Sequence, residues 1–191
     1  MHRSTTTATT TLALALVITA VSTAASTAVA AGETVCRGML GPRAFDHIFV
    51  PEDASCTLNR TRLNGSIRVG RGAALQANGV RVNGNVQAEG ALHVGIGPGS
   101  QIGGSVQIKR GGGASITGAR IAGDLQFDGN QLPLAATDSL IGGNLQAAKN
   151  RGGVTFERNR VDGNLQCREN VPAPVGDRSL AISKEGQCET L

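Results

Sequence analysis

Ile141-Gly-Gly143-Asn-Leu-Gln-Ala147 returns in nearly the same form as Val161-Asp-Gly163-Asn-Leu-Gln-Cys167. Four earlier segments, which begin at Leu63, Val82, Ile102 and Ile121, carry the same pattern of an apolar residue, a glycine and a second apolar residue. The marker glycines of these segments are Gly65, Gly84, Gly104, Gly123, Gly143 and Gly163. Their regular interval indicates a tandem repeat whose structural unit is about 20 residues long.

Apolar and polar residues alternate after each marker glycine, as in Asn144-Leu-Gln-Ala147. This period of two indicates a strand with one buried face. A second apolar cluster occurs about midway between successive marker glycines, at Leu75, Val94, Ile116, Leu134 and Val154. Two or three short strands per repeat cannot bury a face alone, but stacked repeats can. The sequence therefore predicts an all-β fold consisting of a single parallel β-helix, or β-solenoid.

The repeat extends toward the N-terminus in degenerate form. Asp46-His-Ile-Phe-Val50 stands one repeat length before Gly65-Ser-Ile-Arg-Val69. We therefore expect six to seven coils of about 19–20 residues each. A leucine-rich repeat would need Leu-x-x-Leu-x-Leu and a helical side, and a left-handed hexapeptide helix would need a six-residue period. Neither is present, and we therefore expect a right-handed coil.

Residues 1–31 have the composition of an export signal. His2 and Arg3 precede the apolar run 12–18, and small residues lead to Ala30 and Ala31. The apolar run is too short for a membrane span, which needs about 20 residues. We predict a signal peptide at 1–31, an N-terminal cap with a degenerate coil at 32–60, solenoid repeats at 61–170 and a C-terminal cap at 171–191.

Four cysteines stand in two separated pairs. Cys36 and Cys56 are one repeat length apart near the start, and Cys167 and Cys188 are separated by nearly the same interval at the end. Exported thiols usually form disulfides. Coils stacked about 4.8 Å apart would place the two pairs at opposite ends of the molecule, too far apart for a disulfide between them. We therefore expect Cys36–Cys56 and Cys167–Cys188. Each disulfide is expected to cap an end that could otherwise template polymerisation; the alternative is that it only staples a terminus.

The composition excludes several classes of protein. The chain has 27 glycines, four Phe and neither Trp nor Tyr, without the Gly-X-Y period of collagen. The formal net charge is +4, and it falls to +3 once Arg3 is removed with the signal. Nucleic-acid-binding proteins usually cluster more positive charge and add aromatic residues for stacking. We therefore expect no nucleic-acid partner, and no membrane partner after signal cleavage.

Stacking would turn equivalent repeat positions into rows on the surface. The glutamine row comprises Gln87, Gln107, Gln126, Gln146 and Gln166; the asparagine row comprises Asn85, Ser105, Asp124, Asn144 and Asn164. Stacked amides can hydrogen-bond along such a face and stabilise it. Alternatively, the face is a docking site for a glycan, an ice surface or a protein, formed by the glutamine row together with Asn144 and Asn164.

Three further sets of residues recur with the repeat. Asn130, Asn150 and Asn170 are expected to form a turn ladder, because asparagine hydrogen-bonds within turns. The marker glycines are expected at positive φ or at tight corners. Arg62, Arg81, Arg120 and Arg160 share one position, where a basic stripe could hold an anionic polymer. Acidic residues nearby dilute this charge, which favours the interpretation of an ordinary solvated surface.

Known catalytic and metal-binding patterns are missing from the sequence. His47 and His93 are single and lack zinc-site or triad spacing. Asp124, Asp128 and Asn130 are too few oxygen donors for a hard cation, which generally takes six or more. A β-helix polysaccharide lyase or hydrolase is the enzyme alternative, but such enzymes carry large loops around a groove. We expect no catalytic residue, no metal and no cofactor.

The tail Gly163-Asn-Leu-Gln-Cys167, closing with Lys184-Glu-Gly-Gln-Cys188, resembles a group of secreted bacterial proteins with Gly-Asn-Leu-Gln-Cys repeats. The resemblance covers about residues 36–191 and implies a secreted β-solenoid, with no particular activity or site. More loosely, the winding is similar to that of bactofilin-type polymerising β-helices, which are cytoplasmic and lack such disulfides.

The expected function is that of a secreted, non-enzymatic structural or interaction protein of the cell surface or extracellular space, monomeric and with capped ends. The alternative is a module that binds cell-wall polymer, glycan or a surface protein through the glutamine and asparagine rows.

Overall fold

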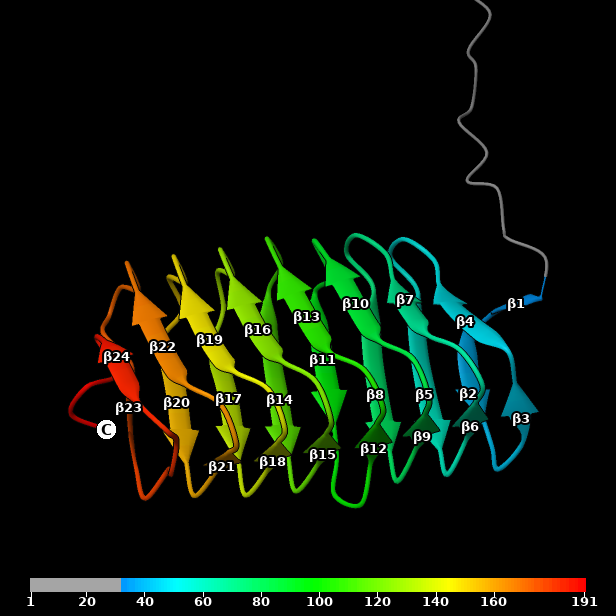
Figure 1. Cartoon of the computed structure of the whole chain (residues 1–191). Coiled ribbons are helices and arrows are strands. Elements are labelled where there is room, and N and C mark those ends of the chain that lie inside the picture. Colours follow the sequence, from blue (N-terminus) through cyan, green and yellow to red (C-terminus); the bar gives the residue numbers. More distant parts are fainter. Residues whose placement is uncertain (1–31) are drawn as a thin grey trace, which may run out of the picture.

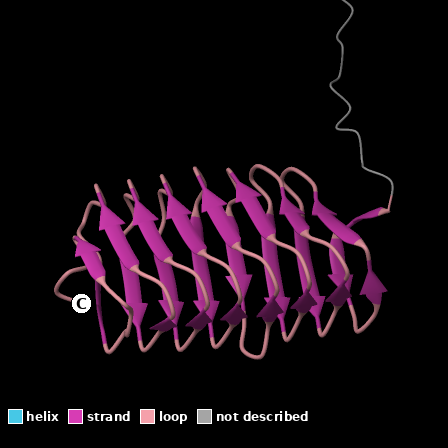
Figure 2. Cartoon of the chain, viewed as in Figure 1, coloured by secondary structure: helices cyan, strands magenta, loops and turns pink. Residues whose placement is uncertain are grey.

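The computed structural model describes residues 32–191, and the predicted signal peptide at 1–31 lies outside the described residues. The described chain consists of strands and connecting loops, as Figure 2 shows. The strands form three parallel sheets that run along the whole stack (Figure 1). This arrangement confirms the predicted all-β parallel solenoid.

Sheet A contains β1 (Glu33–Val35), β4 (His47–Val50), β7 (Ile67–Val69), β10 (Val86–Glu89), β13 (Val106–Lys109), β16 (Leu125–Asp128), β19 (Leu145–Ala148), β22 (Leu165–Arg168) and β24 (Lys184–Gly186). Sheet B contains β2 (Gly38–Leu40), β5 (Ser55–Asn59), β8 (Ala74–Asn78), β11 (His93–Ile96), β14 (Gly113–Thr117), β17 (Leu134–Thr137), β20 (Val154–Glu157) and β23 (Val175–Asp177). Sheet C contains β3 (Ala44–Phe45), β6 (Arg62–Leu63), β9 (Arg81–Val82), β12 (Gln101–Ile102), β15 (Arg120–Ile121), β18 (Leu140–Ile141) and β21 (Arg160–Val161).

Each full coil passes once through sheets A, B and C, and successive coils pair in register. Gln126 aligns with Gln146 in sheet A, and Ile121 with Ile141 in sheet C. The solenoid has about eight coils, so the expected count of six to seven was too low. The additional coil is residues 33–45, which has no marker glycine and joins the stack through pairing of β1 with β4 and of β2 with β5. The hand of the coil stays a prediction.

The inward faces of the three sheets form one continuous core. Leu145 of sheet A, Ile116 of sheet B and Ile141 of sheet C are at most 1% exposed. Because three faces meet around a narrow axis, small and branched side chains fill the space without many aromatics. Phe127 and Phe156 stack inside with ring centroids 6.3 Å apart, an arrangement that contributes about 1 kcal/mol beyond burial.

The corner between sheets A and B is lined inside by the buried asparagine ladder, which comprises Asn130, Asn150 and Asn170. The main-chain N–H of Asn130 donates to Asn150 Oδ1 at 3.0 Å, and that of Asn150 donates to Asn170 Oδ1 at 3.1 Å. Their Nδ2 atoms donate to carbonyl oxygens in the sheet A strand of the preceding coil, as Asn150 Nδ2 does to Phe127 O at 3.1 Å. The expected turn ladder is confirmed, and buried main-chain polar groups at this corner are thereby paired.

The marker glycines do not occur at positive φ, so that part of the expectation was wrong. Positive φ occurs instead just before the buried corner, at Gly129, Lys149 and Glu169. The marker glycines sit where coils approach most closely: a Cβ on Gly84 would overlap Ser66 Oγ and lie 2.8 Å from Gly65 O. The expected tight corner is therefore correct, and its reason is contact between coils.

Both disulfides are present as expected. The Cα atoms of Cys36 and Cys56 are 5.6 Å apart, and those of Cys167 and Cys188 are 5.2 Å apart. All four cysteines are buried. The first disulfide ties the first coil to the second, and the other ties the C-terminal segment to β22 of sheet A. Disulfides form and persist in oxidising compartments, which fits an extracellular environment.

Candidate binding face on sheet A

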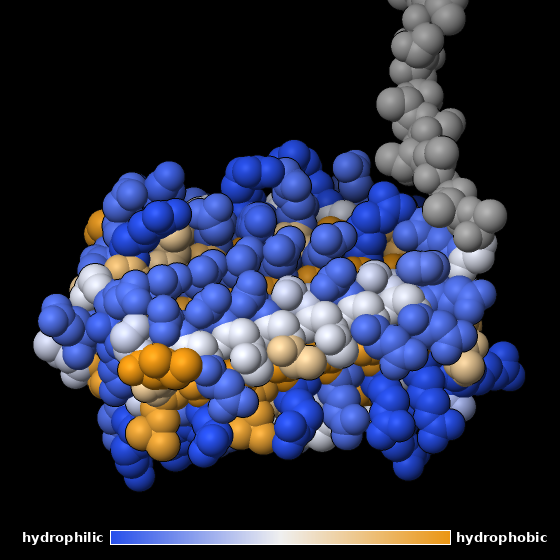
Figure 3. All heavy atoms as spheres, viewed as in Figure 1, coloured by the Kyte–Doolittle hydropathy of each residue, from blue (hydrophilic) through white to orange (hydrophobic). Residues whose placement is uncertain are grey.

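The glutamine row occupies the middle outward position of the strands from β10 to β22. Register pairs these residues from Gln87 to Gln166 without interruption. The same row continues to Arg68 on β7 at one end and to Glu185 on β24 at the other. The surface on this side of the molecule is mainly hydrophilic over sheet A (Figure 3).

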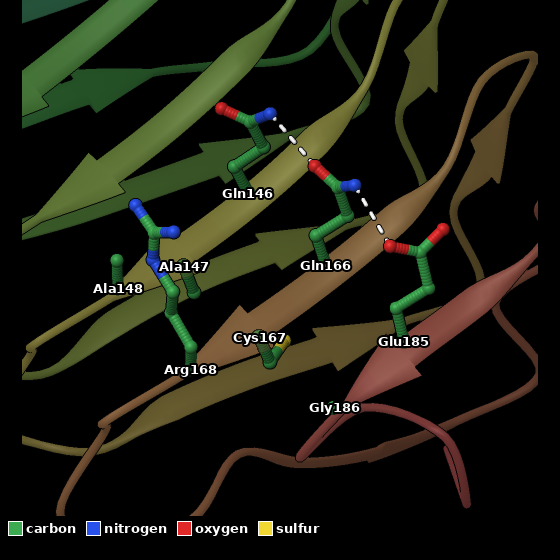
Figure 4. A pocket seen from close by; sticks show the side chains of 8 residues that line it. All are labelled: Gln146, Ala147, Ala148, Gln166, Cys167, Arg168, Glu185 and Gly186. Carbon is green, nitrogen blue, oxygen red and sulfur yellow. Dashed lines mark hydrogen bonds between the residues drawn. The ribbon is translucent and has the colours of Figure 1, made fainter.

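The C-terminal half of the row is a chain of hydrogen bonds. Gln126 Nε2 donates to Gln146 Oε1 at 3.0 Å, Gln146 Nε2 donates to Gln166 Oε1 at 2.8 Å, and Gln166 Nε2 donates to Glu185 Oε2 at 2.9 Å. Figure 4 shows the last two of these bonds. All the amides point the same way, so the chain ends on a carboxylate that only accepts. Hydrogen bonds from the Ser183 hydroxyl and from Gln166 lower the pKa of Glu185 below its usual value.

The N-terminal half of the row is differently arranged. Within residues 32–191, the side chains of Gln87 and Gln107 make no hydrogen bond to another protein group. They border an open concavity together with Arg68, Glu89 and Lys109. Their side-chain amides therefore face solvent and take no part in the hydrogen bonds that run along the rest of the row.

Arg68 closes this end of the row. Its guanidinium carbon lies 4.3 Å from the centroid of the Phe49 ring, and its Nη2 is 2.7 Å from Glu33 Oε2. Phe49, which the alternation would place outward, is thereby covered and only 6% exposed.

The asparagine row has a structural role that the sequence pattern does not distinguish from binding. Its side-chain oxygens accept main-chain N–H groups from the next coil, as Asp124 Oδ1 does from Asn144 at 2.7 Å and Asn144 Oδ1 does from Asn164 at 2.9 Å. Asn164 Nδ2 also donates to Glu185 Oε1 at 3.2 Å. The Asn144 Oδ1 and the Asn164 Nδ2 are therefore already paired, and the glutamine row is the better candidate for contact with a ligand.

A second concavity lies at the C-terminal end of sheet A. Gln146, Gln166 and Glu185 border one side and Arg168 the other, over a floor of Ala147, Ala148, Cys167 and Gly186 (Figure 4). A row of amides flanked by one cation and one anion is suited to polar neutral groups such as hydroxyls, because it offers donors and acceptors together.

Sequence reasoning missed Arg68, Arg168 and Glu185 as parts of this face. The signal for two of them was the period itself, since Arg68 stands one repeat length before Gln87 and Glu185 stands one repeat length after Gln166. Their residue types broke the pattern of glutamines and hid the continuity.

The other candidate groups do not converge. Asp124 directly precedes β16 and Asp128 is its last residue, and Asn130 is buried with its Nδ2 donating to Ile108 O. His47 Nδ1 accepts the main-chain N–H of Ser66 at 3.1 Å, and His93 lies on sheet B. In the part of the chain that the structure describes, no group of three or more His, Cys, Asp or Glu side chains is placed to hold a metal ion.

Fold and face together define a parallel β-solenoid with disulfide-tied ends and a polar row along one sheet. In comparisons with family models, with curated proteins and with solved structures, nothing matched this chain significantly. Residues 32–191 contain no helix with the length and hydropathy of a membrane span.

Proposed function

We propose that this protein is a secreted, non-enzymatic structural or interaction protein of the cell surface or extracellular space. The two buried disulfides support an oxidising location. The observation that carries the proposal is the unbroken register of sheet A, in which one residue type occupies the same outward position on five consecutive strands. Such a face repeats one weak contact many times, which suits a repetitive partner, whereas catalysis needs different groups held at one point.

The test is incubation of the purified protein with soluble cell-wall polymers and neutral glycans, followed by assay of new reducing ends and of polymer length. We expect no turnover. Turnover by the unmodified protein that disappears in the Asp128→Asn variant would contradict the proposal. We choose Asp128 because it is an outward carboxylate of sheet A that takes no part in the hydrogen bonds of the glutamine or asparagine rows, so its substitution leaves both rows intact. Loss of turnover in Asp124→Asn alone would be weaker evidence for a catalytic carboxylate, since Asp124 Oδ1 also accepts the main-chain N–H of Asn144 and holds two coils together.

A second candidate, binding of a glycan through the glutamine row, is favoured by the free amides of Gln87 and Gln107. Replacing both by alanine removes contacts without breaking the hydrogen-bonded half of the row. We expect glycan capture, measured by a pull-down from wall-polymer fractions, to fall in this variant and to survive in Gln76→Ala. Gln76 is an outward glutamine on sheet B and serves as a matched control. Equal capture by all three proteins would reject the glutamine row as the site.

A further inference from the structure

Three shallow concavities lie along sheet C, and neighbouring ones share lining residues. Arg60, Arg62, Arg81 and Gln101 line the first. The second shares Gln101 and adds Arg120, Asp138 and Leu140. The third shares Arg120 and Leu140 and adds Arg160 and Asp162. The three concavities follow one another along sheet C from β6 to β21. We call this stretch of surface the groove, and we name its charged lining, Arg60, Arg62, Arg81, Arg120, Arg160, Asp138 and Asp162, the arginine strip.

The strip has a regular spacing that comes from the fold. Arg62, Arg81, Gln101, Arg120, Leu140 and Arg160 occupy one register row of sheet C. Coils are about 4.8 Å apart in a stack of this kind. Arg81, Arg120 and Arg160 stand at successive intervals of two coils, so their Cα atoms repeat at about 10 Å.

The floor of the groove is low because small residues line it. Gly79, Gly99, Ala122 and Gly142 border the first and third concavities. Gly79 has φ +59, a backbone conformation that favours glycine. The exposed arginine side chains therefore stand above the floor and present their guanidinium groups to a ligand lying along the groove.

The strip accounts for the excess positive charge of the described chain. Residues 32–191 contain 17 Lys and Arg, since Arg3 lies outside them, against 14 Asp and Glu. Five of these arginines and two of these aspartates belong to the strip, which leaves equal numbers of basic and acidic residues elsewhere. The strip therefore carries a net charge of +3, equal to the net charge of the described chain.

Most of these arginines have no acidic partner. Among the described residues, Arg60, Arg62, Arg81 and Arg120 form no salt bridge. Asp138 is held by Arg158, an arginine outside the strip, with Nε–Oδ1 at 2.7 Å and Nη2–Oδ2 at 2.9 Å. Arg160 lies 3.3 Å from Asp162. Four guanidinium groups along the groove are therefore available to an external anion.

We propose that the arginine strip binds a linear polysaccharide that carries a carboxylate on every second sugar ring. Two rings in line span about the length of two coil steps, and guanidinium groups pair carboxylates in a bidentate fashion. Leu140, which is 40% exposed between Arg120 and Arg160, offers an apolar contact to the C–H face of a ring. Nucleic acid fits poorly, because its phosphates repeat about every 3.4 Å per strand and the strip has no aromatic residue for stacking.

Binding is to be measured with hyaluronan, whose carboxylates stand on every second ring, by calorimetry of the purified protein at low and raised salt. Carboxyl-reduced hyaluronan is the neutral comparison, and poly(glycerol phosphate) is the phosphodiester comparison. The test variant is Arg81→Gln with Arg120→Gln, because the same row already contains Gln101. The control is Arg71→Gln with Arg151→Gln, which removes the same charge from exposed positions away from sheet C. Circular dichroism checks that both variants fold.

We expect hyaluronan to bind the protein, to bind more weakly as salt rises, and to bind the test variant about tenfold more weakly. The control variant should change affinity by less than about twofold. Three results would overturn the proposal: no binding of hyaluronan at low salt, equal loss of affinity in the test and control variants, or binding as strong to either comparison polymer as to hyaluronan.

Discussion

Asn150 donates its side-chain Nδ2 to Asn170 Oδ1 at 2.8 Å, and both residues occupy the same inner corner of successive coils. Asn150 is completely buried, and its Oδ1 in turn accepts from the main-chain N–H and the Nδ2 of Asn130. A single side chain therefore pairs polar groups of three coils.

Replacing Asn150 by alanine should destabilise the protein by about 3 kcal/mol, because the substitution leaves the buried Asn130 main-chain N–H without its acceptor and removes the Asn150 Nδ2 bonds to Phe127 O and Asn170 Oδ1. Each such group costs about 1–3 kcal/mol. The shift in urea denaturation midpoint measures the effect. Asn83→Ala, at an exposed asparagine outside this ladder, should change the midpoint little. Similar midpoints for the two variants would show that the buried ladder is not needed.

Gly143→Ala should also destabilise the protein, by about 1–3 kcal/mol. The added Cβ would overlap Asp124 Oδ1, the atom that accepts the Asn144 main-chain N–H. Gly41→Ala is the matched control, because its Cβ would meet nothing within 4 Å. Thermal melting of the two variants provides the measurement. A melting temperature of Gly143→Ala equal to that of Gly41→Ala would contradict the contact between coils as the reason for the marker glycines.

Removal of Cys36–Cys56 by a double serine substitution should cost about 3 kcal/mol, as expected for closing a loop of about 20 residues. Because each coil contacts only its neighbours, the loss should remain local. Hydrogen exchange should accelerate in β1, β2 and β3 and stay slow in β16 and β19. Serine substitution of Cys167 and Cys188 should show the reverse distribution, with faster exchange in β24. Uniform acceleration in either variant would argue against local closure of the ends.

The last coil should loosen at acid pH through Glu185. Its pKa in the folded protein is lowered by Ser183 and Gln166, so its contribution to stability is present above the unfolded value of about 4.5 and is lost as pH falls through the folded value. The protection of β24 amides, relative to their intrinsic exchange rate at each pH, should fall below pH ~4.5. Glu185→Gln should remove this dependence, since glutamine still accepts from Gln166. Glu189→Gln, which removes a carboxylate outside the row, should retain it.

Much of the fold follows from the sequence because each repeat position stacks on the equivalent position of the next coil. The alternation around Leu145 and the repeat interval predict strand, face and register together. The pairing of Cys36 with Cys56 follows from the same stacking, since the other two cysteines are several coils away. The first coil was missed because Glu33-Thr-Val35 has no marker glycine, and its place depends on pairing with β4.

The candidate site was predicted only as a row of equivalent residues. The period places Gln87 and Gln166 alike, but one amide is free and the other is bonded to Glu185. That difference depends on which way each amide turns and on what ends the row, and neither is visible in a repeat pattern. The asparagine row was also ambiguous, because only the positions of the next coil's N–H groups show that Asn144 Oδ1 is occupied.

The sequence by itself determined the coil length, the buried face, the disulfide pairing and the rows, because a parallel stack repeats one register and the spacing of residues records it. The tertiary structure decided which rows are internally paired and which are free, and that the unpaired arginines share one groove on sheet C. These properties depend on distances between side chains of different coils and faces, which are set only when the sheets close around a common core.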